Sequence, residues 1–367
     1  MRTKIAFLVG CFLVLSTSFA CTDFQIEAVD GSVVIGRTFE FAIDFQPQIM
    51  VYPRGMSEVS IDEKGQKGIS WTSQYGYLGV NAFNMTNAVI DGINEKGLSA
   101  EALMFSESKF QESNSGNFIV ENDLPRWILG NFATVEEVKA AIRKINVTAP
   151  FYTAEMQMSP NIHIAVHDAQ GKNIVIEFID GEQKIYDNPI GVMTNEPTFD
   201  WQLTNLRNYI NLGNYDYKPV MVDGVTVEPT GDGSGWLGLP GDATPPSRFV
   251  KVALYVHKAS QPENVTEAIN LANHIIYSVD IPKDLILTEV APNTTMSDYT
   301  AWVLIKDLVN KVLYYRCYTD GTLRMIDMKE LAFTKGAPMK SIPIDNPAMI
   351  LDVTEELQPT MSGSKDR

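Results

Sequence analysis

The order of strand-like and helix-like segments limits the fold class of this chain. Alternating apolar and polar residues, a pattern typical of β-strands, fill much of residues 24–105 and return at 161–178 and 300–328. Helical periodicity appears at 134–145, 199–212, 248–259 and 262–277, where Pro262 stands near the start of the last segment. Strands therefore follow strands instead of alternating with helices. This order predicts an α+β fold with mainly antiparallel sheets, in which the last strands return to sheets begun near the N-terminus.

Two segments predict β-hairpins. Residues 24–37 alternate on both sides of Asp30-Gly31, a dipeptide that favours tight turns, and residues 161–178 alternate about a similar turn. If the first hairpin folds back at Asp30-Gly31, the strand that carries Arg37 lies beside the strand that begins at Cys21. The sequence thus predicts a guanidinium close to a cysteine.

The first 20 residues have the layout of a secretory signal peptide. Arg2 and Lys4 precede an apolar run over residues 5–15, and small residues lead to Ala20. The run has about 11 residues, against the roughly 20 that a membrane span needs. We expect cleavage before Cys21 and a periplasmic or secreted mature protein that is not held in the membrane.

A second interpretation of this cleavage point remains open. A bacterial lipobox also ends on a cysteine, in which case Cys21 would carry a lipid. That motif prefers leucine three residues before the cysteine, where this chain has Ser18. The two interpretations exclude each other, because acylation of the Cys21 amine would remove a base that the catalytic hypothesis below requires.

Composition and charge limit which kinds of molecule the protein is expected to bind. The formal net charge is −16, and loss of Arg2 and Lys4 with the leader would leave 27 basic and 45 acidic side chains, or −18. Such an acidic surface argues against nucleic acid or an anionic membrane as a partner. The 45% apolar content and the absence of a linker-like stretch favour one domain over residues 21–356. Residues 357–367 are expected to be a disordered tail.

The cysteines and histidines do not suggest a disulfide framework or a metal site. Cys11 lies in the leader, so the mature chain keeps only Cys21 and Cys317, which could form one bridge in an oxidising compartment. Cys317 is more typical of a small buried apolar residue. His163 and His167 share a strand face, but the four histidines lack the spacing of metal ligands. We expect no metal and no cofactor.

The chemistry that a terminal Cys21 would support is nucleophilic catalysis. A cysteine thiol ionises near pH ~8.5 and an α-amine near ~8, so the amine of the same residue can take the thiol proton. This is the principle of an N-terminal nucleophile. A guanidinium from Arg37 would favour the thiolate, and Glu40, three residues on, could hold the α-ammonium.

Five short motifs occur in order and together resemble one family. They resemble the choloylglycine hydrolases and penicillin V acylases, and the resemblance runs from Cys21 to about Met328. The motifs are Cys21-Thr22, Gly36-Arg37-Thr38-Phe39-Glu40, Asn94-Glu95-Lys96-Gly97-Leu98, Thr194-Asn195-Glu196-Pro197-Thr198-Phe199-Asp200 and Gly238-Leu239-Pro240-Gly241-Asp242 followed by Pro246-Ser247-Arg248-Phe249.

This resemblance implies the four-layer αββα sandwich of the N-terminal-nucleophile hydrolases and hydrolysis of linear amides other than peptide bonds. Cys21 then matches the nucleophile and base, and Arg37 the arginine beside the thiol. Glu40 matches an aspartate that holds the amine, Asn195 a side-chain oxyanion donor, and Arg248 the second arginine of the site. The resemblance also implies a homotetramer that acts on a small-molecule amide.

The chain departs from the family pattern at two positions. Glu40 stands in place of aspartate, so its carboxylate reaches one methylene further. Met104 stands where bile-salt hydrolases carry asparagine and some penicillin acylases tyrosine, so only its backbone N–H could serve as an oxyanion donor. The loss of a polar side chain there argues against a dedicated bile-salt hydrolase. The family's substrate loops fall near residues 41–46 and 156–159, where we assign no substrate-binding residues.

The expected substrate is an amide with a bulky apolar acyl group, such as a conjugated bile acid, a phenoxyacetyl β-lactam or an acyl-homoserine lactone. Two alternatives stay open. One is a lipid-anchored, noncatalytic binding protein of the same fold. The other is a lipid amidase similar to acid ceramidase, which would share the cysteine and arginine but not the Asn-x-Pro and Pro-Ser-Arg-Phe motifs.

Overall fold

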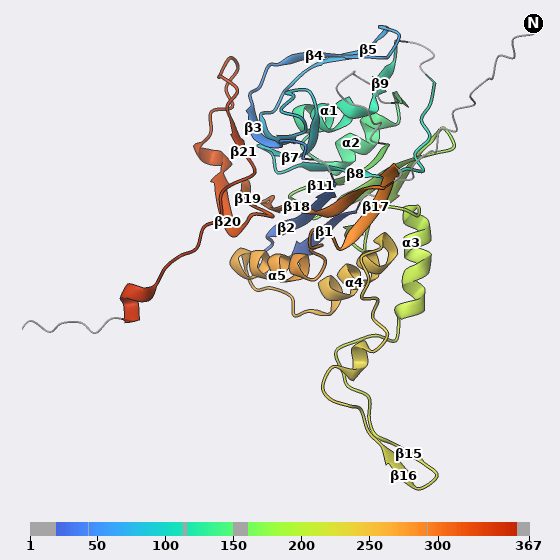
Figure 1. The fold of residues 1–367 in the computed structure, drawn as a ribbon. Helices are drawn as coiled ribbons and strands as arrows, with labels where there is room; N and C mark the ends of the chain where they lie inside the picture. Colours follow the sequence, from blue (N-terminus) through green and yellow to red (C-terminus); the bar gives the residue numbers. More distant parts are fainter. Residues whose placement is uncertain (1–19, 43, 113–115, 150–160, 292, 358–367) are drawn as a thin grey trace, which may run out of the picture.

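Two β-sheets stack face to face and carry helices on their outer surfaces (Figure 1). The structure is a computed structural model that describes residues 20–42, 44–112, 116–149, 161–291 and 293–357. One sheet is covered by α1 (Leu124–Asn131) and α2 (Val135–Ile142), and the other by α4 (Pro245–Lys258) and α5 (Val265–Tyr277). This four-layer αββα sandwich confirms the predicted fold class.

The first sheet contains Cys21 and has the strand order β14-β1-β2-β18-β19-β20, with β17 also paired to β18. The predicted first hairpin is present as β1 and β2, and the C-terminal strand β18 pairs with β2, which confirms that the end of the chain completes this sheet. Its strands are β1 (Cys21–Glu27), β2 (Val33–Phe41), β14 (Val192–Met193), β17 (Ile286–Ala291), β18 (Thr294–Asp307), β19 (Val312–Cys317) and β20 (Asp320–Asp327).

The second sheet has the order β13-β12-β11-β8-β7-β6-β3-β21 and lies between the first sheet and helices α1 and α2. The second predicted hairpin is its β11–β12 pair. Its strands are β3 (Gln48–Tyr52), β6 (Tyr77–Asn81), β7 (Val89–Asn94), β8 (Ser99–Met104), β11 (Ile162–His167), β12 (Asn173–Ile179), β13 (Glu182–Asp187) and β21 (Ser341–Pro343).

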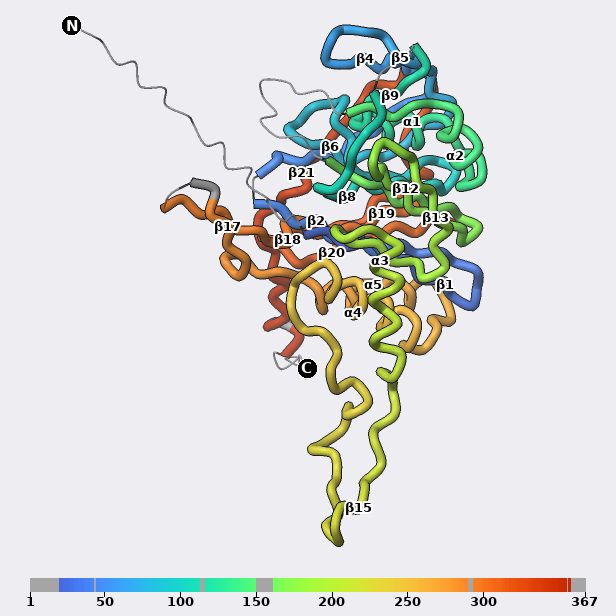
Figure 2. Tube along the Cα trace, turned by 90° about the vertical axis from the view of Figure 1, so that its right-hand side faces the viewer, coloured from blue at the N-terminus to red at the C-terminus, as the bar shows by residue number. Residues whose placement is uncertain are grey.

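Several smaller elements were not evident in the sequence, whereas helix α3 (Phe199–Leu206) lies within the helical segment predicted over 199–212. A hairpin of β15 (Val220–Val222) and β16 (Val225–Val227) projects away from the sandwich (Figure 2). All six of its residues are exposed, so it lacks the alternation that marks a half-buried strand. The remaining elements are β4 (Ser57–Ile61), β5 (Lys67–Thr72), β9 (Phe118–Val120), β10 (Asn146–Thr148), and the 3-10 turns η1 (Glu121–Asp123), η2 (Arg207–Tyr209), η3 (Ser234–Trp236), η4 (Met328–Glu330) and η5 (Thr354–Leu357).

Helices α2 and α5 begin at side-chain caps, and α1 and α4 have proline in their first turn. The Thr134 hydroxyl accepts a hydrogen bond from the Glu137 backbone N–H at 3.3 Å and starts α2. Asn264 does the same for α5 through the Glu267 N–H at 3.1 Å, so this helix begins later than the proline-led pattern at 262 indicates. Helix α4 begins at Pro245, three residues before the predicted start, and this extra turn carries Arg248 toward the first sheet.

The two strands of the first hairpin are buried along almost their whole length. Strand β2 is buried at every residue and β1 at all but its last. These strands carry Asp23, Arg37 and Glu40, and the adjacent β18 carries Lys306, all of them buried. A buried charge is costly unless it is paired and hydrogen-bonded. The centre of the sandwich therefore contains a polar site rather than a purely apolar core.

Some expectations concern segments beyond the described residues, namely the leader over 1–19, the substrate loop near 156–159 and the tail over 358–367. Across the residues that are described, no helix combines the length and apolar character needed to cross a membrane. Cys21 and Cys317 are both free thiols, so the bridge considered from the sequence is not formed.

Candidate active site

Cys21 is the first residue of β1 and is fully buried. Its nitrogen still carries the peptide bond to Ala20, and this N–H donates to Oδ1 of Asn195 at 2.7 Å. The Ala20 carbonyl accepts a hydrogen bond from the Glu40 N–H at 3.0 Å. The predicted cleavage point thus lies within the first sheet, beside two of the predicted site residues.

Arg37 lies opposite Asp23 in the β1–β2 ladder, and its side chain points toward the second sheet. The guanidinium donates to the carbonyls of Ala102 at 2.8 Å and Thr38 at 2.9 Å, and Nε lies 3.4 Å from Oδ2 of Asp91. Burial opposes its charge, but attraction to Cys21 and Asp91 outweighs burial and raises the pKa of Arg37. Arg37 is therefore a fixed cation that interacts with the cysteine side chain.

Arg248 reaches Cys21 from helix α4, on the other side of the sheet. Its guanidinium donates to the Cys21 carbonyl at 2.5 Å, to the Thr22 hydroxyl at 2.6 Å, to Oδ1 of Asn195 at 2.8 Å and to the Ala243 carbonyl at 2.9 Å. Each of the three guanidinium nitrogens therefore donates at least one hydrogen bond, which fixes the orientation of the group. Arg248 therefore holds both the backbone of the cysteine and the asparagine beside it.

Asn195 follows strand β14 and connects three parts of the site. Its Oδ1 accepts from the Cys21 nitrogen and from Arg248, while its Nδ2 donates to the Met104 carbonyl at 2.8 Å. Met104 ends β8 of the second sheet and is half-buried. The structure thus brings the carbonyl of the last residue of β8 to the asparagine amide, and the role expected for the Met104 N–H stays a prediction.

Glu40 faces the helix layer, because side chains alternate along β2 and Arg37 faces the second sheet. Oε1 of Glu40 accepts from the Thr300 hydroxyl at 2.9 Å. Burial raises the pKa of Glu40 to about 7, with Arg248 acting in the opposite direction. Glu40 is thus a buried carboxyl that contacts Thr300, while the Cys21 nitrogen, which Glu40 was expected to hold, donates to Asn195 instead.

Sequence reasoning missed two residues that position Asn195. The Nε2–H of His163 donates to the Thr194 carbonyl at 2.8 Å, and Nδ1 lies 3.2 Å from Oε1 of Glu177. The same carboxylate oxygen accepts the Phe199 N–H at 2.9 Å. The chain is therefore fixed on both sides of Asn195. The sequence signal was that His163 shares a strand face with His167, which we noted but gave no role.

A second set of missed residues lies behind Arg37, between the sheets. The Lys306 ammonium contacts Oδ1 of Asp91 at 2.7 Å and a carboxylate oxygen of Glu101. Asp23, Glu101 and His167 lie close together in the same layer. The His167 ring contacts Asp23 at 2.7 Å and the Lys306 ammonium contacts Glu101, so both carboxyl groups already have a nitrogen partner and we assign no metal site to them.

A buried cysteine between two arginines, with an asparagine amide on its nitrogen, can present a nucleophile and hydrogen-bond donors to one carbonyl group. In a four-layer αββα sandwich, this arrangement defines the class of amide hydrolases.

The comparisons place the chain within that class. A family model described as linear amide C–N hydrolases, choloylglycine hydrolase family, matches residues 21–344. The chain belongs to this family and is an amidase of the choloylglycine hydrolase and penicillin V acylase type.

Relatives of both kinds are similar to it. The bile salt hydrolase/transferase of Clostridium perfringens is 32% identical over 317 residues, which cover 84% of this chain and 93% of that protein. The penicillin V acylase of Pectobacterium atrosepticum is 25% identical over 348 residues, which cover 89% of this chain and 85% of that protein.

Solved structures of both kinds of enzyme also have the fold of this chain. A variant of conjugated bile acid hydrolase from Clostridium perfringens superposes with a TM-score of 0.80 at 28% identity, covering 91% of this chain and 100% of the other. Penicillin V acylase from Agrobacterium tumefaciens gives 0.72 at 26% identity, covering 90% and 95%.

Proposed function

We propose that this amidase is exported, is cut before Cys21 and uses the Cys21 thiol to remove a bulky apolar acyl group from an amine. One observation carries the proposal: the Cys21 nitrogen, Asn195 and Arg248 form one continuous set of hydrogen bonds on the residue that cleavage would make terminal. The family match also begins at residue 21.

The first half of the reaction would form a thioester. The free α-amine of Cys21 takes the thiol proton, and the sulfur attacks the amide carbonyl carbon. The carbonyl oxygen becomes an oxyanion in the tetrahedral intermediate. When the carbon–nitrogen bond breaks, the α-ammonium gives its proton to the leaving amine, and the acyl group remains on Cys21.

The second half would release the acid. The α-amine takes a proton from water, and the hydroxide attacks the thioester carbonyl carbon. The carbon–sulfur bond then breaks, the α-ammonium returns its proton to the leaving sulfur, and the carboxylic acid leaves. Arg37 would favour the thiolate in both halves, since its guanidinium interacts with the Cys21 side chain.

Asn195 and Met104 are the proposed oxyanion donors. An amide nitrogen has two N–H groups, and only one of those on Asn195 is needed for its bond to the Met104 carbonyl. The second N–H and the backbone N–H of Met104 would hold the developing negative charge. We expect Asn195→Ala to lower kcat by about 10²–10³-fold, because preorganised donors act mainly on the transition state. Steady-state kinetics on the best substrate measure this change.

Asn208→Ala is the matched control for that variant, since Asn208 is exposed beyond helix α3. It should hydrolyse the substrate at the wild-type rate. A normal kcat for Asn195→Ala would remove Asn195 from the proposed mechanism.

The pH dependence of stability reports on Glu40. In the uncut chain its pKa is about 7 instead of 4.5, so the folded state binds this proton more tightly than the unfolded state. The free energy of unfolding should therefore fall as pH rises from about 4.5 to 7. Because 2.5 pKa units correspond to about 3 kcal/mol, Glu40→Gln should remove up to that much of the decline.

Chemical denaturation at several pH values between 4 and 8 tests this effect on a chain that retains Ala20. Glu112→Gln changes an exposed glutamate and serves as the control. Equal slopes of stability against pH in wild type and Glu40→Gln would show that Glu40 does not hold a proton on folding.

The acyl group of the substrate is the next part of the proposal. The relatives are named for bile salts and penicillin V, and Met104 removes a polar side chain from the expected bile-salt position. We therefore favour phenoxyacetyl β-lactams or acyl-homoserine lactones over conjugated bile acids. A release assay on the protein that begins at Cys21, with all three substrate types, tests this preference. Faster turnover of glycine- or taurine-conjugated bile acids would reverse it.

Intact mass of the exported protein tests the N-terminus. The proposal requires a chain that begins at an unmodified Cys21 in the periplasm or medium. A diacylglyceryl adduct would favour the lipid-anchored alternative, and a retained leader would contradict activation by cleavage.

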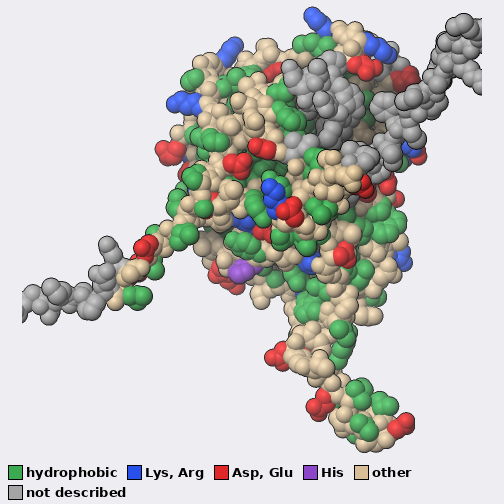
Figure 3. Space-filling view, viewed as in Figure 1, with side chains coloured by type: hydrophobic (Ala, Val, Ile, Leu, Met, Phe, Trp, Pro, Cys, Tyr) green, Lys and Arg blue, Asp and Glu red, His purple; other side chains and the backbone are tan. Residues whose placement is uncertain are grey.

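We also propose a homo-oligomer, with a tetramer as the expected form. The projecting β15–β16 hairpin supports it, since Val220, Met221, Val222 and Val225 are all exposed there. Hydrophobic side chains gather at this end of the molecule (Figure 3). Exposed apolar patches are typical of protein interfaces. Light scattering after size-exclusion chromatography measures the mass, and a monomer would contradict this part of the proposal.

A further inference from the structure

Six charged side chains form a buried group between the two sheets, and the proposed reaction uses only one of them, Arg37. They come from six different strands, and each is buried. Their contacts with one another are ion pairs or charge attractions. The six residues are Asp23 on β1, Arg37 on β2, Asp91 on β7, Glu101 on β8, His167 on β11 and Lys306 on β18.

His167 has a hydrogen-bond partner at each ring nitrogen. Its Nε2 lies 2.7 Å from Oδ1 of Asp23, and its Nδ1 lies 3.0 Å from Oε1 of Gln25. Whether each nitrogen donates or accepts depends on what its partner can do. The orientation of the Gln25 amide therefore determines the protonation of Nδ1.

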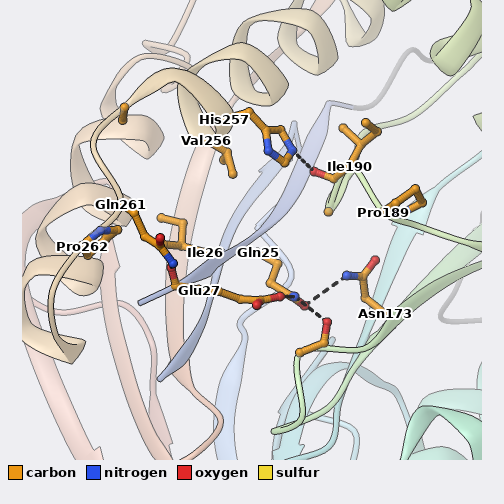
Figure 4. A pocket seen from close by; sticks show the side chains of 13 residues that line it. Gln25, Ile26, Glu27, Asn173, Pro189, Ile190, Val256, His257, Gln261 and Pro262 are labelled. Carbon is orange, nitrogen blue, oxygen red and sulfur yellow. Dashed lines mark hydrogen bonds between the residues drawn. The ribbon is translucent and has the colours of Figure 1, made fainter. Parts of the chain in front are cut away.

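The Gln25 amide can take only one orientation. Its Nε2 donates to Oε1 of Glu27 at 2.9 Å and to the Gly171 carbonyl at 2.8 Å, and both of these atoms are acceptors. Its Oε1 accepts from Nδ2 of Asn173 at 3.2 Å (Figure 4). The oxygen of Gln25 therefore faces His167, and Nδ1 of His167 must carry a proton to donate to it.

The other ring nitrogen faces a carboxylate, which is also an acceptor, so Nε2 must donate as well. A histidine that donates from both nitrogens is an imidazolium. Burial opposes this charge, but attraction to Asp23 and the hydrogen bond with it outweigh burial and raise the pKa of His167. Hydrogen-bond geometry and electrostatics thus agree on a charged side chain.

We propose that His167 is a permanently buried imidazolium that holds the Asp23 carboxylate away from Arg37, so that the charge of Arg37 acts on the Cys21 thiol. His167 is then a positioning residue of the amidase. This inference rests on the proposed role of Cys21 as the nucleophile.

The strand register explains why Asp23 needs such a partner. Asp23 is directly opposite Arg37 in the ladder and two residues after Cys21, so all three side chains share one face of the sheet. Oδ2 of Asp23 has no hydrogen-bond partner among the described residues. Without the imidazolium, the nearest strong partner for Asp23 would be the guanidinium that faces the thiol.

The charges around His167 balance when it is protonated and the three carboxyl groups are ionised. Asp23 faces it from β1, Glu101 from β8 at 3.8 Å, and Lys306 repels it from β18. With every group ionised, the six residues supply three positive and three negative charges. Loss of the His167 proton leaves one uncompensated negative charge near Cys21, which opposes formation of a thiolate.

This imidazolium is also close to solvent through Gln25. Gln25, Glu27 and Asn173 line a cavity of about 370 Å³ at the far end of β1 from Cys21 (Figure 4).

The first test measures alkylation of Cys21 by iodoacetamide against pH in the protein that begins at Cys21. We expect His167→Gln to shift the midpoint of the rate profile upward by about one pH unit. At pH 7 that shift corresponds to about tenfold slower alkylation. His274→Gln, at an exposed position on α5, is the matched control and should follow the wild-type profile. A His167→Gln profile that coincides with wild type overturns the proposal.

The second test does not depend on whether the variant folds. NMR of the wild-type protein with ¹⁵N-labelled histidine should show both ring nitrogens of His167 protonated at pH 7. A neutral tautomer at that pH overturns the proposal. If Cys21 resists alkylation in every protein at every pH, the proposed nucleophile is wrong and the link to the thiol fails with it, while the NMR result still stands for His167 itself.

Discussion

Cys21→Ala should hydrolyse none of the three substrate types above background, a fall of about 10⁴-fold or more. Without the sulfur no thioester can form, and loss of a catalytic nucleophile typically costs most of the rate enhancement. The alanine side chain fits the space of the buried thiol, so the fold should remain. Amine release and thermal unfolding, measured on the same preparation, separate loss of chemistry from loss of structure.

Cys317→Ala is the matched control for this variant. Cys317 is the other free cysteine of the described chain, it is buried in β19, and its sulfur accepts a hydrogen bond from the Asn346 N–H at 3.4 Å. It should keep wild-type turnover, because its side-chain hydrogen bonds within the described chain go to Thr319, Asp320 and Asn346, none of which belongs to the proposed site. Turnover by Cys21→Ala would place the nucleophile elsewhere, whereas loss of activity in both variants would point to a general effect of removing a buried thiol.

The sequence could predict the part of the site that depends on local structure and on short motifs. The turn at Asp30-Gly31 determines the register of β1 and β2, so it also determines that Arg37 lies near Cys21. Asn195 and Arg248 could be found because each belongs to an ordered motif. Their mutual contact at 2.8 Å, across 53 residues, is a result of tertiary structure.

The rest of the site could not be predicted from local pattern. Lys306 and Asp91 are 215 residues apart and meet only because two sheets stack face to face. On a single strand, an alternating lysine or aspartate is typical of the solvent-facing side of a sheet. The sequence therefore indicates an exposed face where the structure has a buried one. The sequence placed His167 on one strand face with His163, but its charge depends on a glutamine and an aspartate from another strand.

The charges between the sheets link stability to the proposed chemistry. Asp91 contacts Arg37 on one side and Lys306 on the other, so a change at Lys306 reaches the guanidinium beside the thiol through one carboxylate. Such a pair contributes little net stability compared with apolar residues, but it is costly to break. The position of Arg37 therefore depends on the stacking of the two sheets, because Asp91 comes from the second sheet and Lys306 from the first.

Lys306→Met should therefore destabilise the fold strongly, by about 3–5 kcal/mol at pH 8, the usual cost of removing one partner from a buried ion pair. The change leaves Asp91 and Glu101 buried without the ammonium that both contact. Burial already raises the pKa of Glu101 to about 7 and raises that of Asp91, and loss of Lys306 raises both further. At pH 5 the folded variant can keep these carboxyls protonated, so the loss of stability should be smaller there.

Chemical denaturation of Lys306→Met at pH 5 and pH 8 measures both parts of this expectation. Lys184→Met removes an exposed ammonium, 2.5 Å from a carboxylate of Glu182, and should change stability little at either pH, since exposed pairs contribute little. Two results would contradict the expectation: a loss at pH 8 no larger than that of Lys184→Met, or a loss that is equal at both pH values. The first would mean that the carboxylates find other partners, and the second that the cost comes from packing of the methionine instead of from unpaired charge.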